Sequence, residues 1–304
     1  MSRVAYLGTS NFAAVVLGHV AASAHEVALV VTPPDRPKGR GKKMQPPPVA
    51  SAAAEAGLPL LQAKSVNEPD AVQRLRDANA DALAVCAFGQ LIREPLLSEW
   101  PPLNVHPSLL PRWRGAAPIE RAIMAGDTTT GVCIMRLTEG LDEGPVALRE
   151  ELPIGSDEDF GSLSARLAEA GGALLVRALG LLDADDLAFT EQEEAGATYA
   201  EKIVRSERRL DPARPAAELR RAVLALTPHV GVYLQLPGDE RLGVRQVRIA
   251  ERDVAAGRLE ADGEALYLGC GEGALELEVV LPPGGRPVAA ADYLRGRRPP
   301  AEAL

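Results

Sequence analysis

The chain has 304 residues, which is enough for two domains with a large buried core. Its composition, 46% hydrophobic and 25% charged residues, is that of an ordinary globular protein. No apolar run approaches the roughly 18 residues of a membrane span, and the first residues lack the pattern of a signal peptide. The net charge of −9 argues against a protein that binds nucleic acid non-specifically. We therefore expect a cytoplasmic protein.

The three cysteines of the chain, Cys86, Cys133 and Cys270, are far apart and odd in number. This arrangement fits neither a disulfide framework nor a zinc site. We expect a reducing compartment and a protein without a bound metal.

Residues 1–184 alternate between strand and helix patterns, which is typical of a parallel sheet with helices on both faces. The predicted strands are residues 3–7, 27–31, 59–61, 82–87, 103–105, 131–137 and 146–152, and the predicted helices are residues 12–22, 49–56, 69–78, 117–125 and 161–182. Residues 32–48 are predicted to be a long loop. The turn at residues 8–10 has a single glycine, which favours a plain strand-to-helix turn with Ser10 as the helix N-cap over a phosphate-binding turn.

The polar residues 185–206 are predicted to be a linker between a first domain, residues 1–184, and a second, residues 207–304. The second part has one helix pattern, residues 216–226, followed by short alternating runs separated by glycine and proline. These runs are residues 231–236, 243–250, 265–270 and 275–281. The predicted fold is therefore α/β, a Rossmann-like parallel-sheet domain followed by a small C-terminal β-barrel of the OB type.

Two polar residues end the predicted strand 103–105. Asn104 and His106 are two positions apart, so both side chains point to one side of an extended segment. An amide and an imidazolium can both donate to the oxyanion of an acyl transfer, and histidine can also move protons near neutral pH. Asp142 lies in a glycine-rich loop, residues 138–145, and could orient the imidazole or accept a proton. Taken singly, each residue also fits an ordinary turn.

A short basic segment interrupts the acidic first part of the chain. Residues 35–43 contain five positive charges and one negative charge. Arginine and lysine in such a loop can each neutralise a phosphate, but a solvated loop without a ligand would look the same.

The segment 104–115, NVHPSLLPRWRG, together with GLDEG at 140–144, resembles the core motifs of the folate-dependent formyltransferases. The resemblance implies that Asn104, His106 and Asp142 form a catalytic trio, and that 10-formyltetrahydrofolate is the co-substrate. It also implies which residues border the folate pocket, namely Phe88, Gly89, Gln90 and Leu91 together with Ser108, Leu109, Leu110 and Pro111.

The basic segment resembles the loop inserted in the branch of this family that formylates the methionyl group of initiator tRNA for translation initiation. The resemblance implies that this loop enters the acceptor stem and that the C-terminal domain also binds tRNA. The implied tRNA-binding residues are Arg36, Lys38, Arg40, Lys42 and Lys43. We expect a monomer that binds no membrane. A formyltransferase acting on a sugar-nucleotide or glycinamide-ribonucleotide amine, and a binding module without catalysis, remain alternatives.

Overall fold

The computed structural model describes residues 1–38, 41–296 and 300–304. The chain forms two compact units, and each unit consists of three separate segments of the sequence. The first unit consists of Met1–Pro118, Thr129–Pro153 and Ser164–Ala200, and the second of Ile119–Thr128, Ile154–Leu163 and Glu201–Leu304. The stretch predicted as a linker is thus divided, with its residues up to Ala200 in the first unit. No described helix is both long and apolar enough to cross a lipid bilayer.

The first unit is built on a seven-stranded sheet in the order β10, β9, β7, β6, β1, β2, β5. The strands are β1 (Arg3–Gly8), β2 (Glu26–Thr32), β5 (Leu60–Gln62), β6 (Ala82–Cys86), β7 (Pro102–His106), β9 (Thr129–Arg136) and β10 (Val146–Pro153). Strands β5, β2, β1, β6 and β7 are parallel; at one edge β9 runs antiparallel to β7, and β10 runs antiparallel to β9. The strand order reverses between β1 and β6, and in such sheets ligands bind at the carboxyl ends of the strands near that point. The predicted α/β fold is confirmed.

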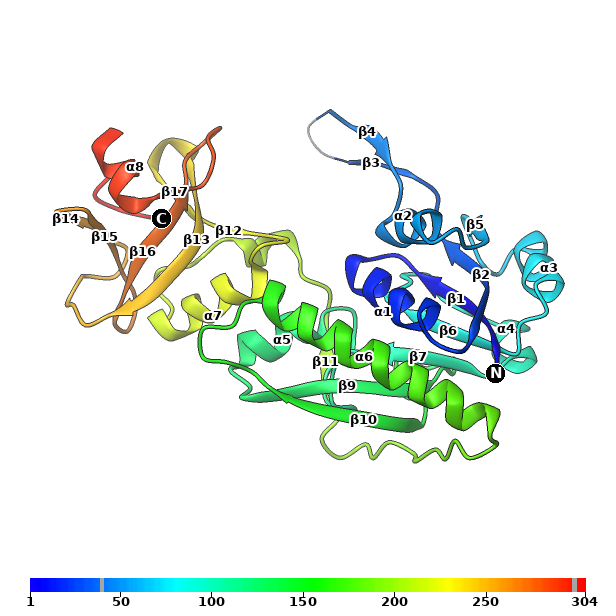
Figure 1. Ribbon diagram of the computed structural model, residues 1–304. Helices are drawn as coiled ribbons and strands as arrows, with labels where there is room; N and C mark the ends of the chain where they lie inside the picture. Colours follow the sequence, from blue (N-terminus) through cyan, green and yellow to red (C-terminus); the bar gives the residue numbers. More distant parts are fainter. Residues whose placement is uncertain (39–40, 297–299) are drawn as a thin grey trace. The chain divides into compact units, whose positions relative to one another are not determined.

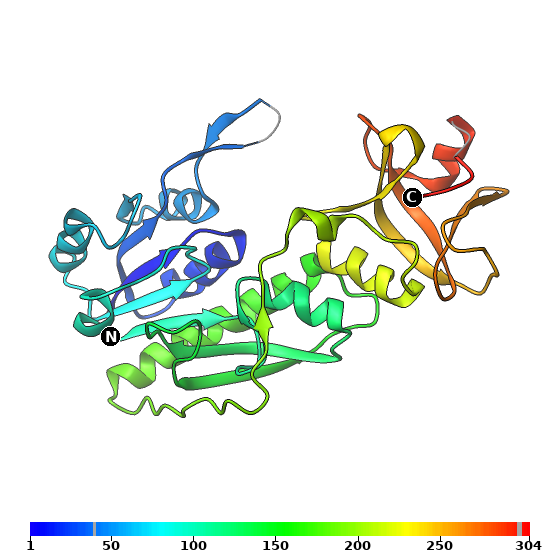
Figure 2. The same ribbon diagram turned by 180° about the vertical axis from the view of Figure 1, so that it is seen from behind.

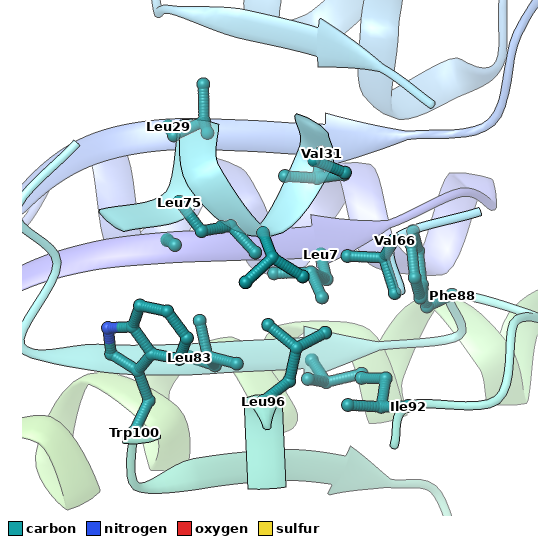
Figure 3. Packing of buried hydrophobic residues seen from close by; sticks show 14 of the residues in the cluster. Leu7, Leu29, Val31, Val66, Leu75, Leu83, Phe88, Ile92, Leu96 and Trp100 are labelled. Atoms are coloured by element: carbon teal, nitrogen blue, oxygen red, sulfur yellow. The ribbon is translucent and has the colours of Figure 1, made fainter. Parts of the chain in front are cut away.

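Helices cover both faces of this sheet (Figures 1 and 2). They are α1 (Asn11–Ala21), α2 (Pro48–Glu55), α3 (Pro69–Asp77), α4 (Leu96–Glu99) and α6 (Phe160–Asp183). Alternate residues of β1 serve opposite faces, because side chains alternate along a strand. Leu7 packs with Leu75 of α3 and Leu96 of α4 in one buried cluster (Figure 3). Tyr6 points the other way, and its hydroxyl donates to the Ala13 carbonyl of α1 at 2.6 Å.

The turn between β1 and α1 has the predicted form. The Ser10 hydroxyl is the N-cap of α1 and accepts a hydrogen bond from the backbone N–H of Ala13 at 3.3 Å. Such a cap supplies one of the acceptors that the first turn of a helix lacks.

The predicted loop 32–48 contains a β-hairpin instead. Strands β3 (Arg36–Lys38) and β4 (Lys43–Gln45) pair antiparallel, and they extend away from the seven-stranded sheet next to α2 (Figures 1 and 2). Its base is held by the Gln62 side-chain amide, which donates to Asp35 Oδ1 at 2.8 Å. Proline and lysine are poor strand formers, so these short strands have no signal in the residue pattern.

The second unit contains an antiparallel sheet in the order β12, β13, β16, β15, β14, with β17 beside β16. The strands are β12 (Val232–Gln235), β13 (Arg241–Ala250), β14 (Leu259–Asp262), β15 (Ala265–Gly269), β16 (Ala274–Leu281) and β17 (Val288–Ala289). The helices are α5 (Pro118–Ala125), α7 (Ala216–Leu226) and α8 (Ala290–Gly296), with the 3₁₀ helices η1 (Arg205–Arg208) and η2 (Pro237–Asp239). Pro118, the first residue of α5, belongs to the first unit. The predicted strands are present, but within the described residues their pairing does not close a barrel.

The two edges of this sheet are instead connected by the last residues of the chain. The N–H of Leu259, in edge strand β14, donates to the carbonyl of Ala301 at 2.9 Å. The N–H of Leu304 donates to the carbonyl of Gln235, in edge strand β12, at 2.8 Å. A C-terminal segment without regular strand pairing therefore satisfies edge groups that a closed barrel would pair.

Candidate active site

Two adjacent parallel strands carry the predicted site to one edge of the sheet. β6 and β7 are neighbours, with Cys86 opposite Val105, so their carboxyl ends lie side by side. Asn104 and His106 both belong to β7, where the alternation of side chains directs them to the same face. Both are buried, at 9% and 4% exposure.

The imidazole of His106 has an acceptor at each nitrogen. Nε2 lies 2.9 Å from the Trp113 carbonyl oxygen, and because a carbonyl can only accept, Nε2 carries a proton. Nδ1 faces Asp142 Oδ2 at 3.6 Å, which is longer than a hydrogen bond. Nδ1 is the nitrogen left to serve a substrate.

Asp142 reaches His106 from the loop between β9 and β10. Its Oδ2 accepts a hydrogen bond from the backbone N–H of Gly115 at 2.8 Å, and its side chain is 15% exposed. Its backbone has φ +52°, in the left-handed region that L-residues rarely adopt. The fold thus brings together two predicted residues from distant stretches of sequence.

The amide of Asn104 is available to a ligand. In the part of the chain that the structure describes, this side chain makes no hydrogen bond, although the residue is largely buried. Its nitrogen and oxygen are not among the fully buried polar atoms that lack a partner, so the amide is open to solvent. A polar substrate atom next to β7 could therefore accept a hydrogen bond from it.

The loop that carries Asp142 depends on Gly144. A Cβ at this position would lie 1.9 Å from the backbone carbonyl oxygen of Arg136. We expect Gly144→Ala to destabilise the protein by about 1–3 kcal/mol, because backbone must move to admit the methyl group. Thermal unfolding would measure this as a lower Tm.

A second alanine variant provides the control for this prediction. Gly18 in α1 is exposed, and a Cβ there would have no atom within 4 Å. Gly18→Ala should leave Tm unchanged or raise it, since alanine favours helix by up to about 1 kcal/mol over glycine. Equal Tm values for the two variants would contradict the steric account of Gly144.

The predicted folate residues after β6 divide into two kinds. Phe88 is 3% exposed in the sheet core, and Gln90 accepts from the Val66 N–H at 2.9 Å, so both hold the loop itself. Gly89 has φ +75° and is exposed, and the Leu91 side chain is 60% exposed. Gly89 and Leu91 are therefore the accessible members of this segment.

The predicted folate residues after β7 form a tight turn. The buried Ser108 hydroxyl donates to the Arg112 carbonyl at 2.6 Å, and Leu110 packs in a buried cluster with Cys133, Met135 and Val146. Leu109 and Pro111 remain partly exposed. The Leu109 side chain lies against Gly131 of β9. A Cβ added to Gly131 would lie 2.5 Å from Leu109 Cδ2.

The predicted tRNA-binding residues lie on the β3–β4 hairpin. Arg36, Lys38, Lys42 and Lys43 are all exposed, and within the described ranges none of these four has an ion-pair partner. Arg40 lies outside the described residues. Unpaired positive charges on a projecting hairpin suit a polyanionic ligand.

Residues 185–200, predicted to be part of a linker, contact two segments of the site: residues 113–115 and the loop that carries Asp142. Strand β11 (Tyr199–Ala200) pairs with β8 (Arg114–Gly115), and the Thr198 hydroxyl accepts from the Trp113 N–H at 2.9 Å. Gln192 donates to two carbonyls of the Asp142 loop. A polar, acidic stretch carries no signal for such contacts.

Neither a thiol nucleophile nor a metal centre is found among the described residues. All three cysteines are buried and free, and burial raises the pKa of the Cys86 thiol to about 12 and that of Cys133 to about 11. Thiols with such pKa values are poor nucleophiles near neutral pH. No group of three potential metal ligands was found in the same residues.

Comparisons with known proteins agree along nearly the whole chain. Residues 2–179 match the family model described as formyl transferase, and residues 202–298 match that described as formyl transferase, C-terminal domain. A methionyl-tRNA formyltransferase of Methylobacterium sp. (strain 4-46) is 43% identical over 302 residues, covering 97% of this chain and 96% of its own. Another protein of that name, from Parvibaculum lavamentivorans, is 42% identical over 300 residues, which cover 97% of this chain and 96% of its own.

Solved structures support the fold at lower identity. An N-formyltransferase from Helicobacter canadensis, solved with folinic acid and dTDP-3-aminofucose, superposes with a TM-score of 0.66 at 13% identity and covers 91% of this chain and 98% of its own. HypX from Aquifex aeolicus superposes with a TM-score of 0.64 at 16% identity over 97% of this chain and 48% of its own. From the two family models and the near full-length relatives, we conclude that the chain belongs to the formyl transferase family.

Proposed function

We propose that this chain transfers the formyl group of 10-formyltetrahydrofolate to the amino group of methionyl-initiator-tRNA, in the cytoplasm and as a monomer. The observation that carries the chemistry is the approach of His106 Nδ1 to the Asp142 carboxylate, on the side of β7 that also carries the Asn104 amide. The choice of acceptor is supported by the near full-length relatives of that name and by the exposed basic hairpin. We further propose residues 1–184 as the catalytic domain and residues 207–304 as a tRNA-binding domain.

In the proposed mechanism the methionyl amine attacks the formyl carbon directly. Asp142 accepts the proton that the amine loses as the new C–N bond forms. The Asn104 amide and the Nδ1–H of His106 donate hydrogen bonds to the formyl oxygen, where negative charge develops. Cleavage of the bond to N10 then re-forms the carbonyl, and N10 takes up the proton that Asp142 accepted, which regenerates the carboxylate. No bond to the enzyme forms at any step.

In this scheme the folate lies along the carboxyl ends of β6 and β7. The accessible residues there are Gly89 and Leu91 on one side and Leu109 and Pro111 on the other. They offer a largely apolar surface with backbone groups, which suits a flat heterocycle with a few hydrogen-bonding positions.

The acceptor is tested by competition between amines. Purified protein is given 10-formyltetrahydrofolate with charged initiator tRNA, with a dTDP-amino sugar, or with glycinamide ribonucleotide. We expect turnover with methionyl-tRNA at least about 100-fold above the other two in kcat/KM. Preference for either small acceptor would reject the tRNA assignment and leave the formyl chemistry standing.

Removal of two hairpin charges is expected to weaken tRNA binding in a salt-dependent way. In the double variant Lys42→Ala/Lys43→Ala, the KM for tRNA should rise, and the slope of log KM against log salt should fall by about 2, one unit for each lost phosphate contact. The KM for folate should not change. Initial rates between 50 and 200 mM salt provide the measurement.

The control removes the same charge elsewhere on the first unit. Lys64 and Arg74 are exposed and lie outside the hairpin. In Lys64→Ala/Arg74→Ala the salt slope should match that of the unchanged protein. If both double variants lower the slope equally, the net charge of the protein attracts the tRNA. That result would contradict a specific role of the hairpin.

A further inference from the structure

The loop that presents Asp142 is held by one side chain from a distant segment. The Gln192 Nε2 group donates to the carbonyl oxygen of Asp142 at 2.8 Å and to that of Gly144 at 2.7 Å. Both hydrogens of one amide are thus used on the same loop. Because Asp142 has a left-handed backbone, its conformation must be stabilised by its surroundings.

A buried arginine fixes the orientation of that amide. Arg114 Nε donates to Gln192 Oε1 at 3.1 Å, and the arginine residue is 1% exposed. Since a guanidinium only donates, the oxygen of the amide must face Arg114 and the nitrogen must face the loop. The second contact of this guanidinium, from Nη1 to Glu194 at 3.2 Å, points to an exposed carboxylate.

The same two segments hold Asp142 at a second point. Gly115, next to Arg114, donates its N–H to the Asp142 carboxylate, and β8 and β11 pair Gly115 with Ala200. Gly115 has φ +117°, and a Cβ there would lie 2.9 Å from the Ala200 carbonyl oxygen. Hence Gly115 holds the carboxylate of Asp142, and Gln192 holds the backbone carbonyl of the same residue.

We propose that Gln192 is a positioning residue for formyl transfer. By holding the carbonyls of Asp142 and Gly144, it keeps the Asp142 carboxylate at its distance from His106 Nδ1. This inference rests on the proposed roles of His106 and Asp142. Gln192 itself contacts no reacting atom.

The main test is Gln192→Glu, which has nearly the same shape. The carboxylate can still accept from Arg114, but it has no N–H to donate to the two loop carbonyls. We expect kcat to fall about 10–100-fold, as for a catalytic group displaced by about 1 Å, while the KM values for folate and tRNA stay within about threefold. Gln192→Ala, which adds no charge, should show the same loss of kcat.

A matched control uses the other partner of Arg114. Glu194→Gln removes the charge of the exposed carboxylate and leaves the loop contacts in place, so kcat should be unchanged. A loss equal to that of Gln192→Glu would assign the effect to Arg114 and overturn the proposal.

A double-mutant cycle separates positioning from general stability. In an Asp142→Asn background, measured in single turnovers with excess enzyme, Gln192→Glu should cost no further rate, because the group that it positions no longer acts. An equal loss in both backgrounds would overturn the proposal, whatever the variants do to Tm. Full kcat in Gln192→Glu beside an inactive Asp142→Asn would also overturn it while sparing the proposed function. Full kcat in Asp142→Asn would remove Asp142 from the mechanism and overturn the positioning role of Gln192 with it, while formyl transfer itself would stand.

Discussion

Replacement of Asp142 by asparagine is expected to lower kcat by about 10²–10⁴-fold, the range for loss of a general base. Asparagine has the same shape, and its side-chain oxygen can still accept from the Gly115 N–H, so the loop should keep its form. It cannot accept a proton from the attacking amine. The KM values should change little, because the lost step belongs to the transition state. Steady-state kinetics with charged tRNA provide the measurement.

A second carboxylate of the same loop serves as the control for Asp142. Glu139 is exposed and belongs to the loop 138–145. Glu139→Gln removes the same charge and should keep kcat within about twofold, as surface substitutions away from special features usually do. If Glu139→Gln and Asp142→Asn lose equal activity, the activity depends on the total charge of the loop. That result would contradict the role of Asp142 as the proton acceptor.

Replacement of Asn104 by alanine is expected to lower kcat by about 10²–10³-fold, the usual cost of one oxyanion donor. The reason is that the Asn104 amide has no hydrogen bond among the described residues and lies on the same strand as His106. Its interaction with the formyl oxygen should strengthen as charge develops, so the KM for folate should stay nearly constant. Thermal unfolding of the variant checks that the fold is retained.

The outcome that contradicts this role of Asn104 is a raised folate KM with unchanged kcat, which would make the amide a ground-state contact. A further check combines Asn104→Ala with His106→Ala. Since both groups serve one oxygen, the combined loss should be smaller than the product of the single losses.

Much of the first unit could be predicted because its patterns are local. The buried run 82–86 and the helix 69–77 follow from hydrophobic periodicity, and Ser10 caps α1 as its position before the helix suggests. The β3–β4 hairpin was missed because its strands are short, exposed and rich in lysine and proline. β14, a four-residue strand with two acidic residues, was missed for a similar reason.

The site could be predicted only as separate pieces. Asn104 and His106 could be placed on one side of a strand, because that depends on a spacing of two residues. The approach of Asp142 to His106 depends on the order of β7, β9 and β10 in the sheet, which the sequence alone does not reveal. The contact of Gln192 with the loop depends on the pairing of β11 with β8, two strands of only two residues each.

The central claim is that an amide, an imidazole and a carboxylate converge on one formyl group. A crystal structure with 10-formylfolate, a stable oxidised relative that carries its formyl group on N10 like the donor, would measure this directly. We predict the folate at the carboxyl ends of β6 and β7, with its formyl oxygen within about 3.5 Å of both Asn104 Nδ2 and His106 Nδ1. A folate bound elsewhere, or a formyl group directed away from these two atoms, would contradict the account.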